Sequence, residues 1–139
     1  MWRQGPNTLR ARHGHACVSI MGSNNKVEKV IAISGSGRSV EVLDVKKMQF
    51  AYGLPLPTTL IYPSAVAAKM DNSFGFIYLF GGHNQEKRAR SSSIYVTSMD
   101  MSTMQKWEII GNMSKPREPL NAVLLPDVFT SDCDRSRGT

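Results

Sequence analysis

The chain has 139 residues, the length of one domain with a modest core. Its hydrophobic content of 41% and charged content of 20% exclude wholesale disorder. The formal charge is +6, but the tightest basic group, Lys87, Arg88 and Arg90, falls in a predicted loop. It has no RNA-binding aromatic motif or zinc-finger spacing beside it, so we expect no nucleic-acid partner.

The cysteines and the first residues predict a cytoplasmic protein. Residues 1–14, MWRQGPNTLRARHG, lack the apolar stretch of a signal peptide. No window approaches the about 18 apolar residues of a membrane helix. Cys17 and Cys133 make no disulfide framework, and Cys17 stands in the apolar run HACVSI, which is typical of a buried free thiol. We therefore expect a reducing compartment and no membrane partner.

Short apolar runs predict eight strands, taken here in chain order. The first four cover about residues 14–21, 30–34, 40–43 and 49–51, and the next four cover about 64–70, 75–80, 94–99 and 106–110. Turn residues such as GSNN, LPLP and KMDNS separate them. No window shows a sustained helical period, so the sequence predicts an all-β protein.

The two groups of strands repeat one another. Ala16, Ala65 and Ala122 begin similar apolar runs and follow one another at similar intervals. Phe50 precedes the second of these alanines by the same interval at which Trp107 precedes the third. A repeat of about 50 residues with four strands and glycines after the second strand is typical of a β-propeller blade. Glycine permits close backbone approach there, and aromatic rings suit the wedge between neighbouring blades.

The second unit resembles the kelch repeat family, in which a Gly-Gly pair follows an apolar strand and a Tyr and a Trp come later. It contains IYLFGG at 77–82, then Tyr95 and Trp107. The resemblance covers about residues 2–125 and implies a partial β-propeller of four-stranded antiparallel blades. The markers of the repeat that we predict are Gly35, Gly37, Gly81, Gly82, Tyr95, Phe50, Trp107, Asp44 and Asp100.

The first unit departs from the family pattern. Its glycine pair is interrupted as Gly35-Ser36-Gly37, Ser39 or Val40 stands where Tyr95 would, and a phenylalanine replaces the tryptophan. We divide the chain into a partial propeller, 1–126, and a disordered tail or truncated blade, 127–139. The propeller holds repeat one at about 11–56, repeat two at about 60–112 and the start of a third at 117–126. We expect the remaining blades to come from a longer chain or from self-association.

No residue pattern predicts catalysis, a cofactor or a metal. His13 and His15 share a strand face with Cys17, but a fourth ligand with zinc spacing is missing, which favours structural histidines. The GSGRS stretch at 35–39 lacks the lysine and helix of a phosphate-binding loop. Asp44 and Asp100 occupy equivalent turns of different units, so they would not converge on one substrate.

The longest loop is the best candidate for binding a partner. Residues 83–93, HNQEKRARSSS, carry the predicted contact residues His83, Lys87, Arg88 and Arg90, which suit an acidic protein surface. We expect a noncatalytic protein-interaction module of the scaffold or substrate-receptor type. The kelch resemblance implies partners among ubiquitin-ligase or cytoskeletal components. The alternative is a fragment of a propeller enzyme acting on carbohydrates, similar to galactose oxidase or a sialate epimerase.

Overall fold

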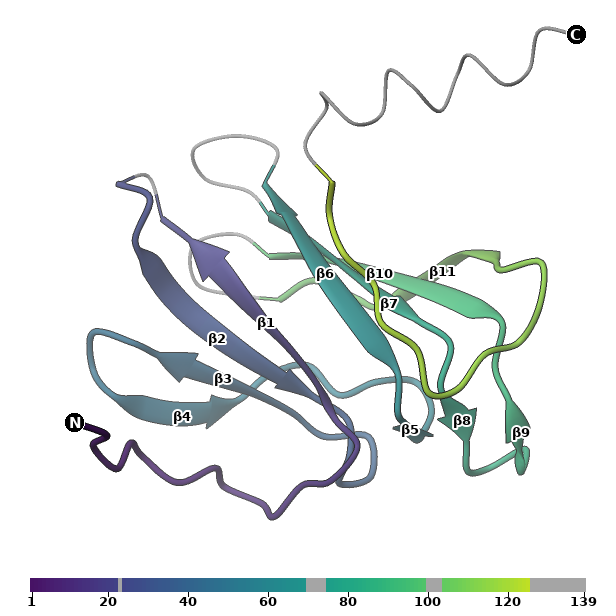
Figure 1. The fold of residues 1–139 in the computed structure, drawn as a ribbon, viewed down its shortest axis with the longest axis horizontal. Coiled ribbons are helices and arrows are strands. Elements are labelled where there is room, and N and C mark those ends of the chain that lie inside the picture. Colours follow the sequence, from purple (N-terminus) through teal and green to yellow (C-terminus); the bar gives the residue numbers. More distant parts are fainter. Residues whose placement is uncertain (23, 70–74, 100–103, 126–139) are drawn as a thin grey trace, which may run out of the picture.

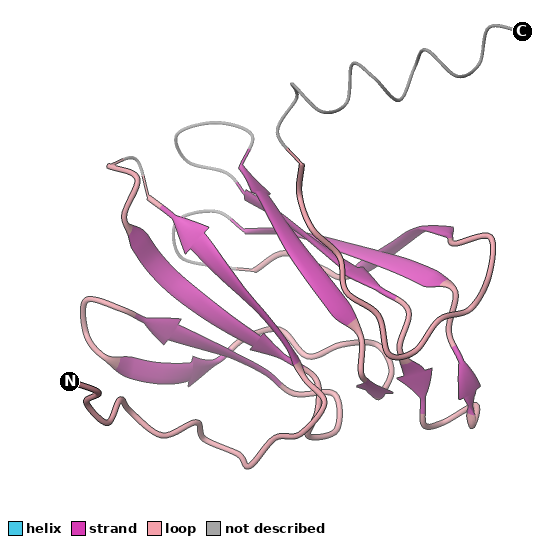
Figure 2. Cartoon of the chain, in the orientation of Figure 1, coloured by secondary structure: helices cyan, strands magenta, loops and turns pink. Residues whose placement is uncertain are grey.

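The computed structural model of the chain describes residues 1–22, 24–69, 75–99 and 104–125. Within these residues every regular element is a β-strand, which confirms the predicted all-β class (Figure 2). Two four-stranded antiparallel sheets stand side by side, and a small three-stranded sheet lies at one end of them (Figure 1).

Each large sheet keeps its four strands in chain order. Sheet 1 contains β1 (Ala16–Met21), β2 (Val27–Ile33), β3 (Val40–Asp44) and β4 (Gln49–Tyr52). Sheet 2 contains β6 (Ser64–Lys69), β7 (Gly75–Phe80), β10 (Ser93–Met99) and β11 (Glu108–Asn112). All eight strands lie close to their predicted bounds, because apolar runs and turn residues alternate clearly along the chain.

The small sheet was not predicted. It pairs β5 (Leu60–Ile61) with β8 (His83–Asn84), and β8 with β9 (Ala89–Arg90). The sequence predicts a loop for residues 83–93, whereas the structure folds 83–90 into a hairpin. Strands this short cannot show hydrophobic alternation, so no sequence pattern marks them.

The core lies between the two large sheets. Val18 and Ile31 pair with one another on sheet 1 and face sheet 2, while Leu79 and Tyr95 pair on sheet 2 and face sheet 1. The sheets come closest at β1 and β6 and diverge from there (Figure 1). Burying an aliphatic side chain of this size contributes about 1.5–3 kcal/mol. Because one apolar cluster contains residues of both sheets, each sheet stabilises the other.

Trp107 and Phe50, the aromatic residues predicted to fill the wedge between blades, lie on different sides of sheet 1. Trp107, just before β11, is 5% exposed in the core between the sheets, and its Nε1–H donates to the backbone oxygen of Leu54 at 3.1 Å. Phe50 pairs with Leu43, one residue out of step with the core-facing Val42. Side chains alternate along a strand, so Phe50 lies on the face of sheet 1 turned away from sheet 2.

A left-handed pair of residues ends the second strand of each sheet. Residues 34–35 have φ angles of 66° and 73°, and residues 81–82 have φ angles of 58° and 86°. The first amide of each pair donates to the chain where the neighbouring strand of the same sheet begins. Ser34 donates to Ser39 O at 3.0 Å, next to β3, and Gly81 donates at 3.1 Å to Ser93 O, the first residue of β10. We call these pairs the corners. The counterpart of the Gly81-Gly82 pair is therefore Ser34-Gly35, and Gly37 lies beyond it.

Each corner also binds the segment that follows the last strand of its sheet. The Gly35 amide donates to Leu60 O at 3.5 Å, and the Gly82 amide donates to Arg117 O at 3.0 Å. A Cβ atom on Gly82 would lie 2.9 Å from Ile61 O, so this close packing requires glycine. Residues 113–122 thus lie against sheet 2 as residues 54–63 lie against sheet 1.

The strand register makes Glu41 the counterpart of Tyr95. Val40 and Ile94 each pair with the residue immediately before a corner, and Glu41 and Tyr95 follow them. The sequence alone predicts Ser39 or Val40 at this position. That prediction aligns the glycines of the two units with each other, whereas the first corner begins with Ser34. Glu41 is nevertheless as buried as the tyrosine.

Glu41 is buried because Arg12 and the backbone before it neutralise its charge. Arg12 Nη2 lies 2.6 Å from Glu41 Oε1, with side chains 2% and 0% exposed. The Leu9 amide donates to Oε2 at 2.7 Å, and the Arg10 amide donates to Oε1 at 3.1 Å. Arg12 precedes Leu60 by the same offset that relates the start of β1 to the start of β6. A buried ion pair in unit one therefore replaces the apolar pair Leu60 and Tyr95 of unit two.

Substitution of the ion pair tests this equivalence. We expect Glu41→Ala to lower the free energy of unfolding by about 3–5 kcal/mol in urea titrations, because it leaves Arg12 buried without its counter-charge. The double variant Arg12→Leu/Glu41→Tyr, which copies the second unit, should recover most of that loss. As a control, Glu108→Ala at an exposed site should change stability by about 0.5 kcal/mol or less. Equal effects of Glu41→Ala and Glu108→Ala would contradict the prediction.

Candidate protein-binding surface

The connections at one end of the sheets form a basic surface. Strand directions alternate, so residues 34–39, 53–63, 81–92 and 113–121 all lie at this end, which we call the connection end (Figure 1). These four fully described segments carry two glutamates, Glu86 and Glu118, against six exposed cations. The cations are Arg38, Lys87, Arg88, Arg90, Lys115 and Arg117. The excess of positive charge favours an acidic partner.

The tip of the β8–β9 hairpin presents two of the predicted contact residues. Asn84 is buried and its Oδ1 accepts a hydrogen bond from the Lys87 amide at 3.0 Å, which closes the turn. Arg88 adopts a left-handed φ of 51°. Both cationic side chains are exposed, and within the described residues no carboxylate pairs with either. Lys87 and Arg88 are thus available to a ligand.

The other two predicted contact residues are engaged by Glu118. His83 Nδ1 lies 3.0 Å from Glu118 Oε2, and Arg90 Nε lies 3.3 Å from Oε1. Glu118 is largely buried, whereas the Arg90 side chain is 64% exposed. These contacts hold the hairpin against residues 113–121. The structure therefore divides the four predicted residues into a free pair at the tip and a pair that positions the hairpin.

A contact across the two units, absent from the sequence prediction, fixes the hairpin on its other side. Arg38, in the β2–β3 connection, donates from Nη2 to Glu86 Oε1 at 2.8 Å. The Thr59 amide also donates to Glu86 Oε1, at 3.3 Å. The Arg38 guanidinium lowers the pKa of Glu86 below its usual value. No single-segment pattern could reveal this pair, because its members lie in connections of different sheets, far apart in the sequence.

The remaining repeat markers have structural surroundings. Asp44 Oδ1 accepts a hydrogen bond from the Lys47 amide at 2.9 Å in the β3–β4 turn, and this bond lowers the pKa of Asp44. Gly37 has a φ of 60° in the β2–β3 connection, with open space where a Cβ atom would stand. Asp100 lies outside the described residues.

The histidine and cysteine side chains near β1 are exposed rather than gathered. His13 and His15 face solvent, and the His13 amide donates to Gly35 O at 3.2 Å. Cys17 is exposed, contrary to the buried thiol that the sequence predicts, and partial desolvation raises the pKa of its thiol. Among the described residues no three His, Cys, Asp or Glu side chains gather as metal ligands. The part of the chain that the structure describes has no helix able to cross a membrane.

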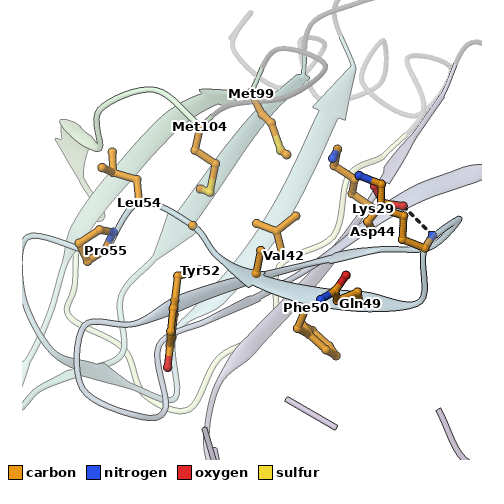
Figure 3. Close-up of a pocket in the computed structure, with 13 residues that line it drawn as sticks. Lys29, Val42, Asp44, Gln49, Phe50, Tyr52, Leu54, Pro55, Met99 and Met104 are labelled. Atoms are coloured by element: carbon orange, nitrogen blue, oxygen red, sulfur yellow. Dashed lines mark hydrogen bonds between the residues drawn. The ribbon is translucent and has the colours of Figure 1, made fainter. Parts of the chain in front are cut away.

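An open groove of about 620 Å³ lies where the sheets diverge. Val42, Met99 and Met104 point into it from the two sides, while Phe50 and Tyr52 point away from it (Figure 3). Lys29 and Asp44 stand at its rim (Figure 3). The methionines make its walls adaptable and apolar, which suits side-chain packing better than acid–base chemistry.

The chain matches no protein-family model and no curated protein sequence. What the structure shares with known architectures is its all-β construction from antiparallel four-stranded sheets.

The Arg38–Glu86 contact predicts a pKa difference that NMR can measure. Because the folded pKa is depressed, this contact stabilises the fold above the unfolded pKa, and the stabilisation is lost as the pH falls through the folded value. In a titration of side-chain carboxyl signals, the midpoint of Glu86 should rise toward its usual value in Arg38→Ala. The neighbouring Arg88→Ala substitution should leave it nearly unchanged. An unaltered midpoint in Arg38→Ala would show that the guanidinium does not set this pKa.

Proposed function

We propose that this chain is a noncatalytic protein-interaction module that binds an acidic protein surface at its connection end. The observation that carries the proposal is the pair of exposed cations, Lys87 and Arg88, which no described carboxylate pairs with, on a hairpin contacted on both sides. Contacts that restrict the hairpin lower the entropy lost when those side chains meet a partner.

The architecture that we propose for the module is a partial β-propeller of the kelch type. Three observations support it: the corners repeat in both units, each corner binds the segment leading to the next unit, and the Ala122 amide donates to Ser64 Oγ at 2.7 Å. The last contact holds Ala122, in the segment that we propose begins a third unit, against β6. In the proposed propeller the connection end would form one rim, and loops at a rim are a usual place for binding.

The partner is best described by its chemistry. Six exposed cations against two engaged glutamates suit a surface or peptide rich in Asp and Glu. The resemblance to kelch repeats favours ubiquitin-ligase or cytoskeletal components in the cytoplasm. The module as proposed needs no cofactor and no catalytic residue.

Charge reversal at the hairpin tip tests the proposal. The variant Lys87→Glu/Arg88→Glu should lose affinity for an immobilised polyglutamate peptide by about tenfold or more, since two attractive contacts become repulsive. The matched control is Lys46→Glu/Lys47→Glu, which changes the same charge at the opposite end of sheet 1 and should bind nearly as well as the wild type. Affinity capture followed by mass spectrometry should retain a discrete acidic protein with the same dependence.

Two results would overturn this function. Equal loss of binding in both charge-reversed variants would mean that net charge alone is responsible. Stoichiometric retention of oligosaccharide or copper, with no captured protein, would favour the alternative of a carbohydrate-acting propeller enzyme.

A further inference from the structure

The outward face of sheet 2 is apolar although no described sheet covers it. Val66, Tyr78 and Val96 form one cross-strand row, and Phe80 pairs with Ile94 in the next. These side chains are half-buried and lie outside the core between the sheets. A solvated face of an antiparallel sheet normally carries polar side chains. The composition of this face therefore fits coverage by another apolar surface.

The chain itself shows what covers such a face. Phe80 stands immediately before the second corner as Ile33 stands before the first, so the row at Tyr78 is the counterpart of the row at Ile31. The row at Ile31 is buried against sheet 2. The interface between sheets 1 and 2 is thus a template for the proposed contact. It shows how a face like the outward face of sheet 2 packs on another four-stranded sheet.

The outward face of sheet 1 is the other half of that template. Val30, Leu43 and Phe50 form one row on this face, in register with Ser19. The corresponding row on sheet 2 contains Ile77 and lies next to Trp107. That row faces sheet 1 in the core. The two faces that no described sheet covers therefore correspond to the two halves of an interface that the chain already contains.

We propose that a second copy of this chain docks head to tail, with the outward face of its sheet 1 on the outward face of sheet 2. The inference rests on the proposed blade architecture, because it requires the two sheets to be equivalent units. The contact is heterologous, so it leaves one open face at each end and allows further copies to add. Its energy comes from burying the rows at Tyr78 and Phe50.

Residues 113–122 limit this association. They bond to the corner of sheet 2 through Arg117 O, as residues 54–63 bond to the corner of sheet 1 through Leu60 O. In the docked arrangement, residues before β1 of the second copy would take the same place. Residues 113–122 of one copy and the residues before β1 of the second copy cannot occupy this place together, so one segment must move away. The association is therefore weak and depends on concentration. Glu118→Ala, which releases His83 and Arg90, should strengthen it.

Sedimentation velocity on the full chain tests the proposal. The average mass of the wild type should rise with concentration from micromolar to millimolar. Tyr78→Lys and Phe50→Lys should each remain monomeric, and an equal mixture of the two should form a dimer, because each retains the face that the other lacks. Met48→Lys, which adds the same charge at an exposed turn residue outside both faces, should associate like the wild type.

The outcomes separate the possibilities. A monomeric wild type at all concentrations overturns the proposal without reference to any variant. Association lost in only one of the two variants overturns the head-to-tail arrangement and indicates pairing of identical faces, and association lost in both but not restored by mixing overturns it as well. Circular dichroism and thermal unfolding establish that each variant is folded; if one is not, Val96→Lys or Leu43→Lys replaces it on the same face. Binding of polyglutamate is measured separately, so failure of either proposal leaves the other distinguishable.

Discussion

The rest of the molecule depends on the corner that ends the second strand of each sheet. There the chain enters a left-handed conformation over a pair of residues, and its amides bind both the start of the neighbouring strand and the segment that follows the last strand of the sheet. This arrangement sets the register of β3 and β10. It also brings the linking segments, residues 54–63 and 113–122, against the sheets. The shared core, the hairpin and the basic surface all follow from that placement.

The two units solve one packing problem with different chemistry. In unit two, Leu60 and Tyr95 fill the space beneath the linking segment with apolar volume, whereas in unit one Arg12 and Glu41 fill it with a hydrogen-bonded ion pair. An ion pair needs geometry that satisfies both charges, so it specifies its neighbours more strictly than a leucine does. The residues before β1 are accordingly bound through their backbone amides to a single carboxylate.

The strands could be predicted from the sequence because each is a short apolar run between turn residues, as at 75–80. The residue-by-residue correspondence of the two groups of strands was harder to predict. Glycine is the residue expected at a left-handed position, whereas Ser34 occupies one of these positions here. The candidate surface was found through its basic composition, at Lys87 and Arg88. That His83 and Arg90 are engaged could not be foreseen, because their partner Glu118 approaches from a distant segment.

The bonds at the corners join backbone atoms, and this has a consequence for how the sequence can change. Away from the corner glycines, only proline removes an amide, so the bonds between each sheet and the segment after it persist while the surrounding side chains change. Mutation can therefore exchange tyrosine for glutamate, or tryptophan for phenylalanine, without unlinking the sheets. Two sheets joined in this way can change their side chains independently of one another.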